Sequence, residues 1–229
     1  MTDIYTSIKI KQNPQKGNNI FQKCSLIIHV YNYFLIIMED KRIIKTKKYL
    51  KDTLIELLDE MPFEKITVTM LCQKADISRI TFYSHYDDKY DLVEDIFQDM
   101  IATGTGYYDE LENRFNKDNN IALGFSHVMD SILKLYYNKY YFFRHVTPER
   151  NPYLAFSYYN HVFSTVEKHT NKENSRHPLK YSNRQITGFL CYGLLGFINE
   201  SHNENDDFHK NERDAHQLLS DILNNGILF

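Results

Sequence analysis

Residues 66–92, which read ITVTMLCQKADISRITFYSHYDDKYDL, most narrowly constrain the fold of this chain. Two short amphipathic segments lie on either side of a tight turn in this stretch. Thr67 and Ser78 stand where N-caps are needed, because their hydroxyls can accept a backbone N–H of the first helical turn. Asp76 tolerates the left-handed conformation that a tight turn requires. The pattern predicts two helices joined by a turn, the second over residues 78–86.

Each short segment has an apolar face and a polar face. In the first segment Leu71, Cys72 and Ala75 share one face at helical spacing. We therefore expect Cys72 to be a small core residue and not a redox switch. In the second segment we expect Ile80 and Phe82 to pack against nearby apolar residues. The remaining surface of the second segment then carries Arg79, Thr81, Tyr83 and His85.

The chemistry of this remaining surface favours DNA as its partner. Arg79 can bond a guanine edge through two hydrogen bonds in the major groove. Tyr83, His85 and Lys89 carry donors with the reach to contact phosphate oxygens, which fix register without selecting a sequence. The alternative is a helical protein-interaction module without sequence-specific DNA binding. Its mark would be an apolar outer face over residues 78–86, and the polar residues there argue against it.

A basic segment precedes the two short helices. Residues 41–51 hold six basic residues, Lys45 and Lys48 among them, and no acidic residue. Residues 41–89 hold 10 basic and 8 acidic residues, whereas residues 90–229 hold 13 and 19. Because phosphate neutralisation is local, a chain of net charge −3 can still bind DNA through its basic part. A solvated helix start is the alternative, but the position directly before a helix-turn-helix favours DNA contact.

Residues 45–97 resemble the DNA-binding domain of the tetracycline-repressor (TetR) family. The matching residues are Phe63, Ile66, Thr67, Val68, Ala75, Ile77, Ser78, Thr81, Phe82, Tyr83, His85, Tyr86, Lys89 and Leu92. The resemblance implies that Thr67 meets a phosphate, that Arg79, Ile80 and Thr81 face base edges, and that Tyr83, His85 and Lys89 contact phosphates. This chain departs from the family pattern at Asp76, where glycine is usual, at Met70, which is often acidic, and at Tyr86, which is usually Phe.

The composition predicts an all-α fold, because 8 Gly and 5 Pro in 229 residues favour long uninterrupted helices. Cys24, Cys72 and Cys191 are odd in number and far apart, so they form neither a disulfide framework nor a zinc site. A reducing cytoplasm fits this cysteine usage. We call residues 107–229 the body of the chain. The histidines there lack the spacing of metal ligands, so we expect no metal and no other cofactor.

Three regions are expected along the chain. We expect residues 1–38 to be a poorly ordered extension or a mis-assigned start, in which case residues 1–37 lie upstream of a true start at Met38. The apolar run from Leu26 to Met38 is shorter than the roughly 20 residues of a membrane span, so a membrane anchor is the weaker alternative. Residues 39–98 form a three-helix DNA-binding domain of the helix-turn-helix type. Residues 99–229 form a helical regulatory domain for ligand binding and dimerisation.

The expected helices of the body cover 107–115, 121–137, 139–145, 152–169, 181–202 and 211–226. Residues 185–199 are apolar on nearly every side, so such a helix must be covered on every side. We expect a two-fold dimer interface there, formed by Phe189, Gly193, Gly196, Phe197, Leu219 and Leu223. Packing of these helices within one chain is the alternative.

Aromatic residues gather in the body, where 12 of the 33 Phe and Tyr residues lie between Phe125 and Phe163. Ordinary core packing is the favoured explanation. An effector pocket is the alternative, and its expected lining residues are Tyr137, Tyr141, Phe156 and Tyr159. The sequence as a whole indicates a homodimeric regulator of transcription that binds double-stranded DNA at a palindrome. We expect a repressor, with an activator as the alternative. A small-molecule effector is a further expected partner, whereas no phosphate loop, nucleophile elbow or paired carboxylate site indicates an enzyme.

Overall fold

The computed structural model describes residues 41–171, 181–204 and 207–224. The predicted extension over residues 1–38 lies outside these ranges. The chain divides into two compact units, Met1–Lys47 and Lys48–Phe229. The second unit holds both short helices and the whole body.

All regular structure in the described ranges is helical, which confirms the all-α prediction there. Residues 41–60 are helical, and the short 3-10 helix η1 (Phe63–Lys65) follows. The further elements, in chain order, are α2 (Val68–Lys74), α3 (Arg79–Tyr83), α4 (Lys89–Phe115), α5 (Ile121–Asn138), α6 (Tyr140–Phe143), α7 (Pro152–Asn171), α8 (Asn183–Glu204) and α9 (Phe208–Asn224). None of these described helices has the length and apolar character needed to cross a membrane.

We call residues 48–86, which include most of helix 41–60 together with η1, α2 and α3, the reading head. Its core forms because apolar residues recur at helical spacing before Pro62. Leu50, Leu54 and Leu58 lie one turn apart and are completely buried. Helix 41–60 ends before Pro62, because the residue that precedes a proline is driven out of the helical conformation. Phe63, immediately after this proline, is also completely buried.

Helix α4 is longer than the sequence analysis predicted. Its N-cap is Asp88, whose carboxylate accepts the backbone N–H groups of Tyr90 and Asp91 at 2.7 and 2.9 Å. The helix then continues through Gly104 to Phe115, so it includes the stretch 107–115 that we expected to be a separate helix. A Cβ at Gly104 would lie 3.3 Å from Leu135 of α5, so this glycine allows close packing of the two helices. The predicted domain boundary between residues 98 and 99 falls inside α4 and stays a prediction.

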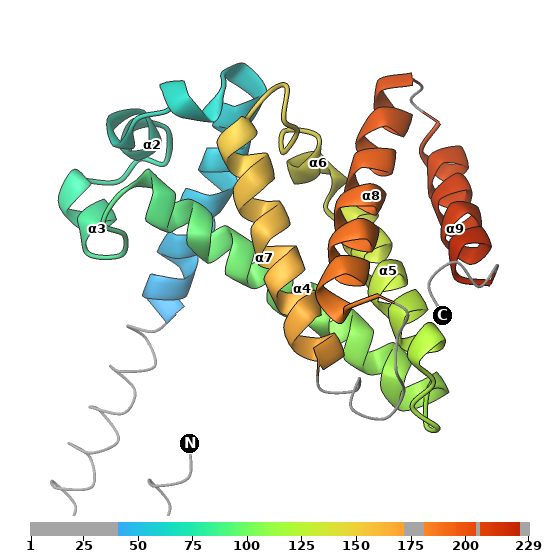
Figure 1. Cartoon of the computed structure of the whole chain (residues 1–229). Helices are drawn as coiled ribbons and strands as arrows, with labels where there is room; N and C mark the ends of the chain where they lie inside the picture. Colours follow the sequence, from blue (N-terminus) through green and yellow to red (C-terminus); the bar gives the residue numbers. More distant parts are fainter. Residues whose placement is uncertain (1–40, 172–180, 205–206, 225–229) are drawn as a thin grey trace, which may run out of the picture. The chain divides into compact units, whose positions relative to one another are not determined.

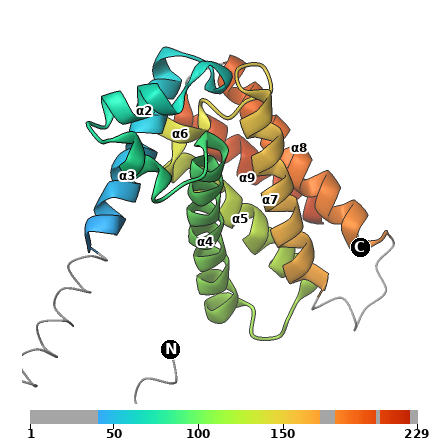
Figure 2. The ribbon, with the colours of Figure 1, turned by 90° about the vertical axis from the view of Figure 1, so that its left-hand side faces the viewer.

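Helix α5 packs against α4, α6, α7, α8 and α9. Helix α4 packs against α5 and α7, α7 packs against α8, and α9 packs against both α5 and α8 (Figure 1). Figures 1 and 2 both show α2 and α3 beside the end at which α4 begins. Helix α4 therefore connects the reading head directly to the body.

Candidate nucleic-acid interface

A short turn joins α2 and α3, and a side-chain hydroxyl caps the N-terminus of each helix. The Thr67 hydroxyl accepts the backbone N–H of Met70 at 3.2 Å, and the Ser78 hydroxyl accepts that of Thr81 at 3.0 Å. Asp76 has a φ of 52°, which is the left-handed conformation. Both predicted N-caps and the predicted turn are confirmed. The departure from glycine at Asp76 is tolerated because Asp is among the residues that adopt this conformation with least strain.

The inner side of α3 is anchored to α4. Phe82 is completely buried, and its ring centroid lies 5.9 Å from that of the buried Tyr86. The Tyr86 hydroxyl donates to the Asp95 carboxylate of α4 at 2.6 Å. Burial, followed by this hydrogen bond, raises the pKa of Tyr86, so the phenol remains a neutral donor. The buried Phe82 and the hydrogen bond of Tyr86 together fix the orientation of α3, which is only five residues long.

The outer side of α3 carries Arg79, Ile80 and Tyr83, all of them exposed. Our expectation that Ile80 packs against neighbours is wrong, because 84% of this residue is exposed. Positions two apart in a helix do not face the same side, so Phe82 and Ile80 cannot both point to the core. The base-facing position that the family resemblance implied for Ile80 agrees with this exposure.

The other residues expected to contact DNA differ in accessibility. Thr67 and Ser78 are exposed, while Thr81 and His85 are half-buried. Lys48 is exposed and pairs with Asp52 one helical turn later. Lys45 is exposed in the unit Met1–Lys47.

Lys89 has different partners from the phosphates that we expected. Its ammonium group donates to the carbonyl oxygens of Phe63, Glu64 and Ile66 at 2.9, 3.0 and 2.9 Å. It also lies 4.5 Å from the centroid of the Phe63 ring. Burial lowers the pKa of Lys89. Since an ammonium group has three protons, these three carbonyls take its full donor capacity. In this structure Lys89 therefore holds the η1 turn in place and does not present a free cation.

No family model matches the chain. Over 50 residues, or 22% of this chain, it is 36% identical to the uncharacterized HTH-type transcriptional regulator YxbF of Bacillus subtilis (strain 168). The matched part covers 13% of the length of that relative.

Solved structures match over most of the chain. A TetR/AcrR-family transcriptional regulator from Aquifex aeolicus VF5 has a TM-score of 0.51 at 15% identity, over 77% of this chain and 99% of that one. The fatty acid degradation regulator FadR from Bacillus halodurans has a TM-score of 0.53 at 14% identity, over 76% and 93%. A TetR transcriptional regulator from Streptococcus agalactiae 2603V has a TM-score of 0.50 at 18% identity, over 80% and 98%. The chain has the TetR-family fold. The resemblance predicted from residues 45–97 is confirmed at the level of the fold.

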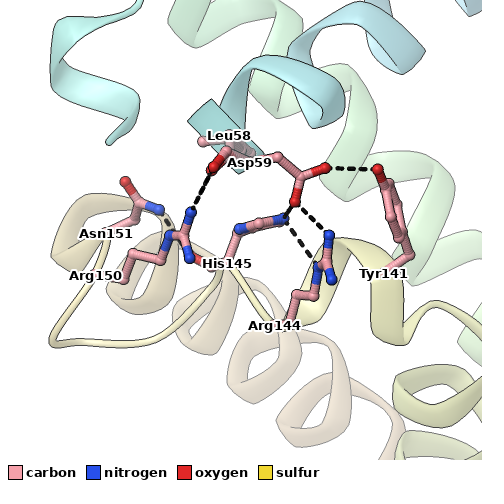
Figure 3. A network of polar contacts seen from close by, with 7 residues as sticks. All are labelled: Leu58, Asp59, Tyr141, Arg144, His145, Arg150 and Asn151. Atoms are coloured by element: carbon pink, nitrogen blue, oxygen red, sulfur yellow. Dashed lines mark hydrogen bonds and ion pairs between the residues drawn. The ribbon is translucent and has the colours of Figure 1, made fainter. Parts of the chain in front are cut away.

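In this TetR-type fold α6 and the segment that follows it contact the end of helix 41–60 (Figure 3). The Asp59 carboxylate accepts the Tyr141 hydroxyl at 2.6 Å and pairs with Arg144. It also lies 3.0 Å from Nε2 of the buried His145. The hydrogen bond from Tyr141 is the largest cause that lowers the pKa of Asp59. Arg150 donates to the carbonyl oxygen of Leu58 at 2.7 Å, where a helix C-terminus needs donors.

Residues 141–151 thus form a polar junction with the reading head, which we call the Asp59 junction. Tyr141 was the only one of its side chains that sequence analysis singled out, and for another role. Charged residues such as Asp59 and Arg144 have no periodic signal, and more than 80 residues of sequence separate the two. Only the folded arrangement of α6 against helix 41–60 brings them together.

A pocket lies between α4, α5 and α7 of the TetR-type fold. Its empty space is about 470 Å³, including solvent at its mouth. The lining residues are Ile101, Gly104, Thr105, Tyr108, Val128, Ser131, Ile132, Leu135, Tyr158, Val162, Thr165 and Val166. None of these described lining residues carries an ionisable acid or base apart from the two tyrosines. Burial raises the pKa of Tyr158, so its phenol stays neutral.

The four residues expected to line an effector pocket do not line this one. Tyr137 is buried against Phe208, with ring centroids 4.3 Å apart. Tyr141 belongs to the Asp59 junction. Phe156 is exposed and Tyr159 is half-buried. An effector site lined by these four side chains stays a prediction, separate from this pocket, whose aromatic lining residues are Tyr108 and Tyr158.

The residues expected at a dimer interface differ in their exposure. Phe189 and Gly193 on α8 are exposed, and a Cβ at Gly193 or Gly196 would meet open space. Phe197 is half-buried. Leu219 on α9 is buried within its own chain, so it does not lie on a free face and the expectation for it is corrected. The side chain of Leu223 lies outside the described residues.

The described residues contain no group of three or more His, Cys, Asp or Glu placed to hold a metal ion. Cys72 and Cys191 are buried free thiols, and burial raises the pKa of both. A raised thiol pKa disfavours the reactive thiolate. Cys72 thus occupies the core position that its spacing predicted.

Proposed function

We propose that this chain is a transcriptional regulator that binds a near-palindromic DNA operator as a homodimer, most simply as a repressor in the cytoplasm. The observation that carries the proposal is the geometry of α3. Phe82 and Tyr86 fix one side of this helix in the core, while Arg79, Ile80 and Tyr83 project from the other. A short, firmly held helix with an exposed guanidinium suits insertion into the major groove.

The exposed face of α8 supports a second copy of the chain as the dimer partner. Phe189 and Tyr192 are large and 58% and 41% exposed, whereas Gly193 and Gly196 leave open space in front of the backbone. In an antiparallel pair of α8 helices with a two-fold axis between residues 192 and 193, Phe189 would pack over the partner's Gly196. Tyr192 would then pack over the partner's Gly193. Such a surface is complementary to itself, as a two-fold interface requires.

The pocket between α4, α5 and α7 supports a small-molecule effector. Since its described lining residues are aliphatic or neutral and polar, an uncharged and largely apolar ligand suits it best. Helices α5 and α7, which form two of its walls, are joined by the segment that makes the Asp59 junction. An effector that favours another spacing of α5 and α7 would displace this segment. It would lower DNA affinity by its preference for the displaced state.

One observation favours a protein-interaction module as the second candidate. Ile80 and Tyr83 give the outer face of α3 more apolar surface than we expected from sequence. Arg79 and the capped N-terminus of the helix favour DNA over this alternative. The regulators that share the fold are transcriptional regulators by name, and we propose no enzymatic activity for this chain.

The test is footprinting on DNA that flanks the protein's own gene. Wild type is expected to protect one near-palindromic site whose half-site centres are one helical turn, roughly 34–36 Å, or a multiple of it apart. Arg79→Ala is expected to lose protection, while Arg114→Ala, on the C-terminal turn of α4, keeps it. The absence of any protected site in an intact, folded preparation, across a library of random duplexes as well, would contradict the proposal.

A further inference from the structure

The aliphatic hydroxyl groups of α3 and its two caps, those of Ser78, Thr81 and Ser84, already form hydrogen bonds within this segment. Ser78 Oγ accepts the Thr81 N–H at 3.0 Å and lies in a second hydrogen bond, at 2.9 Å, with Thr81 Oγ1. Ser84 Oγ donates to the carbonyl oxygen of Thr81 at 2.7 Å. A hydroxyl with a good partner gains little by exchanging it for a base edge. Of the side chains on the outer face of α3, Arg79 and Tyr83 can form hydrogen bonds with DNA, whereas the Ile80 side chain is wholly aliphatic.

Ile80 is the most exposed of the large apolar residues in the described ranges. Its branched side chain is stiff about χ1, so it projects from α3 in a defined direction. Phe82 and Tyr86 already provide the packing that holds α3, and both are buried. Ile80 is thus not needed for the packing of its own helix. An aliphatic group in this place on a base-facing helix calls for an apolar partner.

We propose that Ile80 recognises the 5-methyl group of a thymine in the major groove of the operator. This proposal rests on the proposed function. The thymine methyl is the apolar group that base pairs present in the major groove, whose other edge groups are hydrogen-bond donors and acceptors. Isoleucine has no side-chain donor or acceptor. Placed against guanine, cytosine or adenine it would displace water from polar groups and return no hydrogen bond.

The proposed contact also restricts the base sequence of the operator. Because Ile80 follows Arg79 directly in α3, its thymine lies close in sequence to the base pair that Arg79 contacts. If that contact is to guanine, each half-site contains a guanine with a thymine within one or two base pairs of it. In a palindrome the same pair recurs, inverted, in the other half-site.

The test replaces thymines of the footprinted operator by uracil, one symmetric pair at a time. Uracil lacks the methyl group and keeps every hydrogen-bonding group of thymine. Affinity is measured by fluorescence anisotropy for wild type, Ile80→Ala and Tyr83→Phe. For wild type one pair of replacements is expected to weaken binding about 4-fold per methyl group and about 15-fold for both half-sites. Ile80→Ala is expected to bind the thymine and uracil operators equally, and Tyr83→Phe to distinguish them as wild type does.

Three outcomes would overturn the proposal. If specific binding by wild type is indifferent to uracil at every position, Ile80 reads no methyl group, although the regulator function stands. If Ile80→Ala keeps the full discrimination, another side chain contacts the methyl group. If wild type binds no duplex specifically, both the operator and its thymine contact are rejected. Ile80→Val, which keeps a branched apolar side chain, is expected to retain part of the discrimination.

Discussion

The side-chain oxygen of Asn151 accepts the backbone N–H of Phe63 at 2.7 Å, across 88 residues of sequence. Asn151 is completely buried, and its amide nitrogen donates to the carbonyl oxygen of His145 at 2.8 Å. Phe63 is the first residue of η1, between helix 41–60 and α2, and Asn151 lies just before α7. The Asn151 side chain therefore connects the η1 turn of the reading head to the segment that joins α5 and α7, two helices that line the pocket.

Asn151→Ala should destabilise the protein, because it leaves the buried Phe63 N–H and His145 carbonyl groups without partners. The expected loss in the free energy of unfolding is about 1–3 kcal/mol for such an unsatisfied group. Urea denaturation of the variant and of Asn138→Ala measures it. Asn138 is an exposed asparagine at the end of α5, so its replacement is the matched control. Equal stability of the two variants would contradict a structural role for the Asn151 bonds.

Stability should fall as the pH falls below 6.5, because the pKa of His145 is lowered from that value in the folded protein. Burial is the main cause, and the neighbouring Arg150 and Arg144 add to it against the opposing attraction of Asp59. The unfolded chain therefore binds the proton more readily. The contribution is fully present above pH 6.5 and is lost progressively below it.

His145→Gln should reduce this pH dependence. Melting temperatures of wild type and variant at about pH 7.5 and about pH 5 give the comparison, since both values lie above the window in which Asp59 titrates. Wild type is expected to lose more stability on acidification than the variant does. The same loss in both proteins would assign the pH dependence to other groups.

Lys89→Met should destabilise the reading head and leave the salt dependence of DNA binding unchanged. The substitution keeps an apolar stem beside Phe63 but removes the donor to three carbonyl groups, at an expected cost of roughly 1–3 kcal/mol. Its measurement is urea denaturation together with DNA titration over a series of salt concentrations. A salt slope reduced by about 1 would instead restore the phosphate contact that the sequence indicated.

Val162→Phe should fill the pocket between α4, α5 and α7. Val162 is buried in its lining, so the larger ring occupies space that a ligand would use. The expected result is loss of binding of the neutral apolar dye N-phenyl-1-naphthylamine, with a stability cost of about 1–3 kcal/mol. Ser164→Phe adds the same ring to the exposed side of α7 and should bind the dye like wild type. Undiminished binding by Val162→Phe would place the dye elsewhere.

Phe189→Glu should convert the dimer to a monomer. In the proposed α8 pair a carboxylate at residue 189 would be buried over the partner's Gly196 and would lose its hydration there. Sedimentation velocity measures the mass in solution. Phe115→Glu, at an exposed phenylalanine at the end of α4, is the control and should stay dimeric. A dimer that persists in Phe189→Glu would require another interface.

Sequence was sufficient for the local structure of the reading head. The caps at Thr67 and Ser78 and the left-handed turn at Asp76 depend on short-range hydrogen bonds and backbone sterics, which a few adjacent residues determine. It failed for Ile80, where apolar character was taken as evidence of burial. The packing of Phe82 and Tyr86 in the core determines the orientation of α3, and this orientation places the Ile80 side chain on the outer face.

Long-range contacts escaped the sequence analysis. The chemistry of Lys89 is compatible with both phosphates and backbone carbonyls, and only the position of the η1 turn decides between them. The Asp59 junction and the pocket likewise depend on how α5, α6 and α7 pack, which no motif in the body encodes. Helical periodicity predicted that those helices exist and left their mutual arrangement open.

Titration against two duplexes distinguishes the claim of sequence-specific DNA binding from non-specific attraction to phosphates. One duplex carries the footprinted site and the other has the same base composition in scrambled order, each measured at two salt concentrations. The proposed regulator binds the first duplex more tightly at both concentrations and loses affinity for both as salt rises, because phosphate contacts release counterions. Equal affinity for the two duplexes at both salt concentrations would contradict the claim.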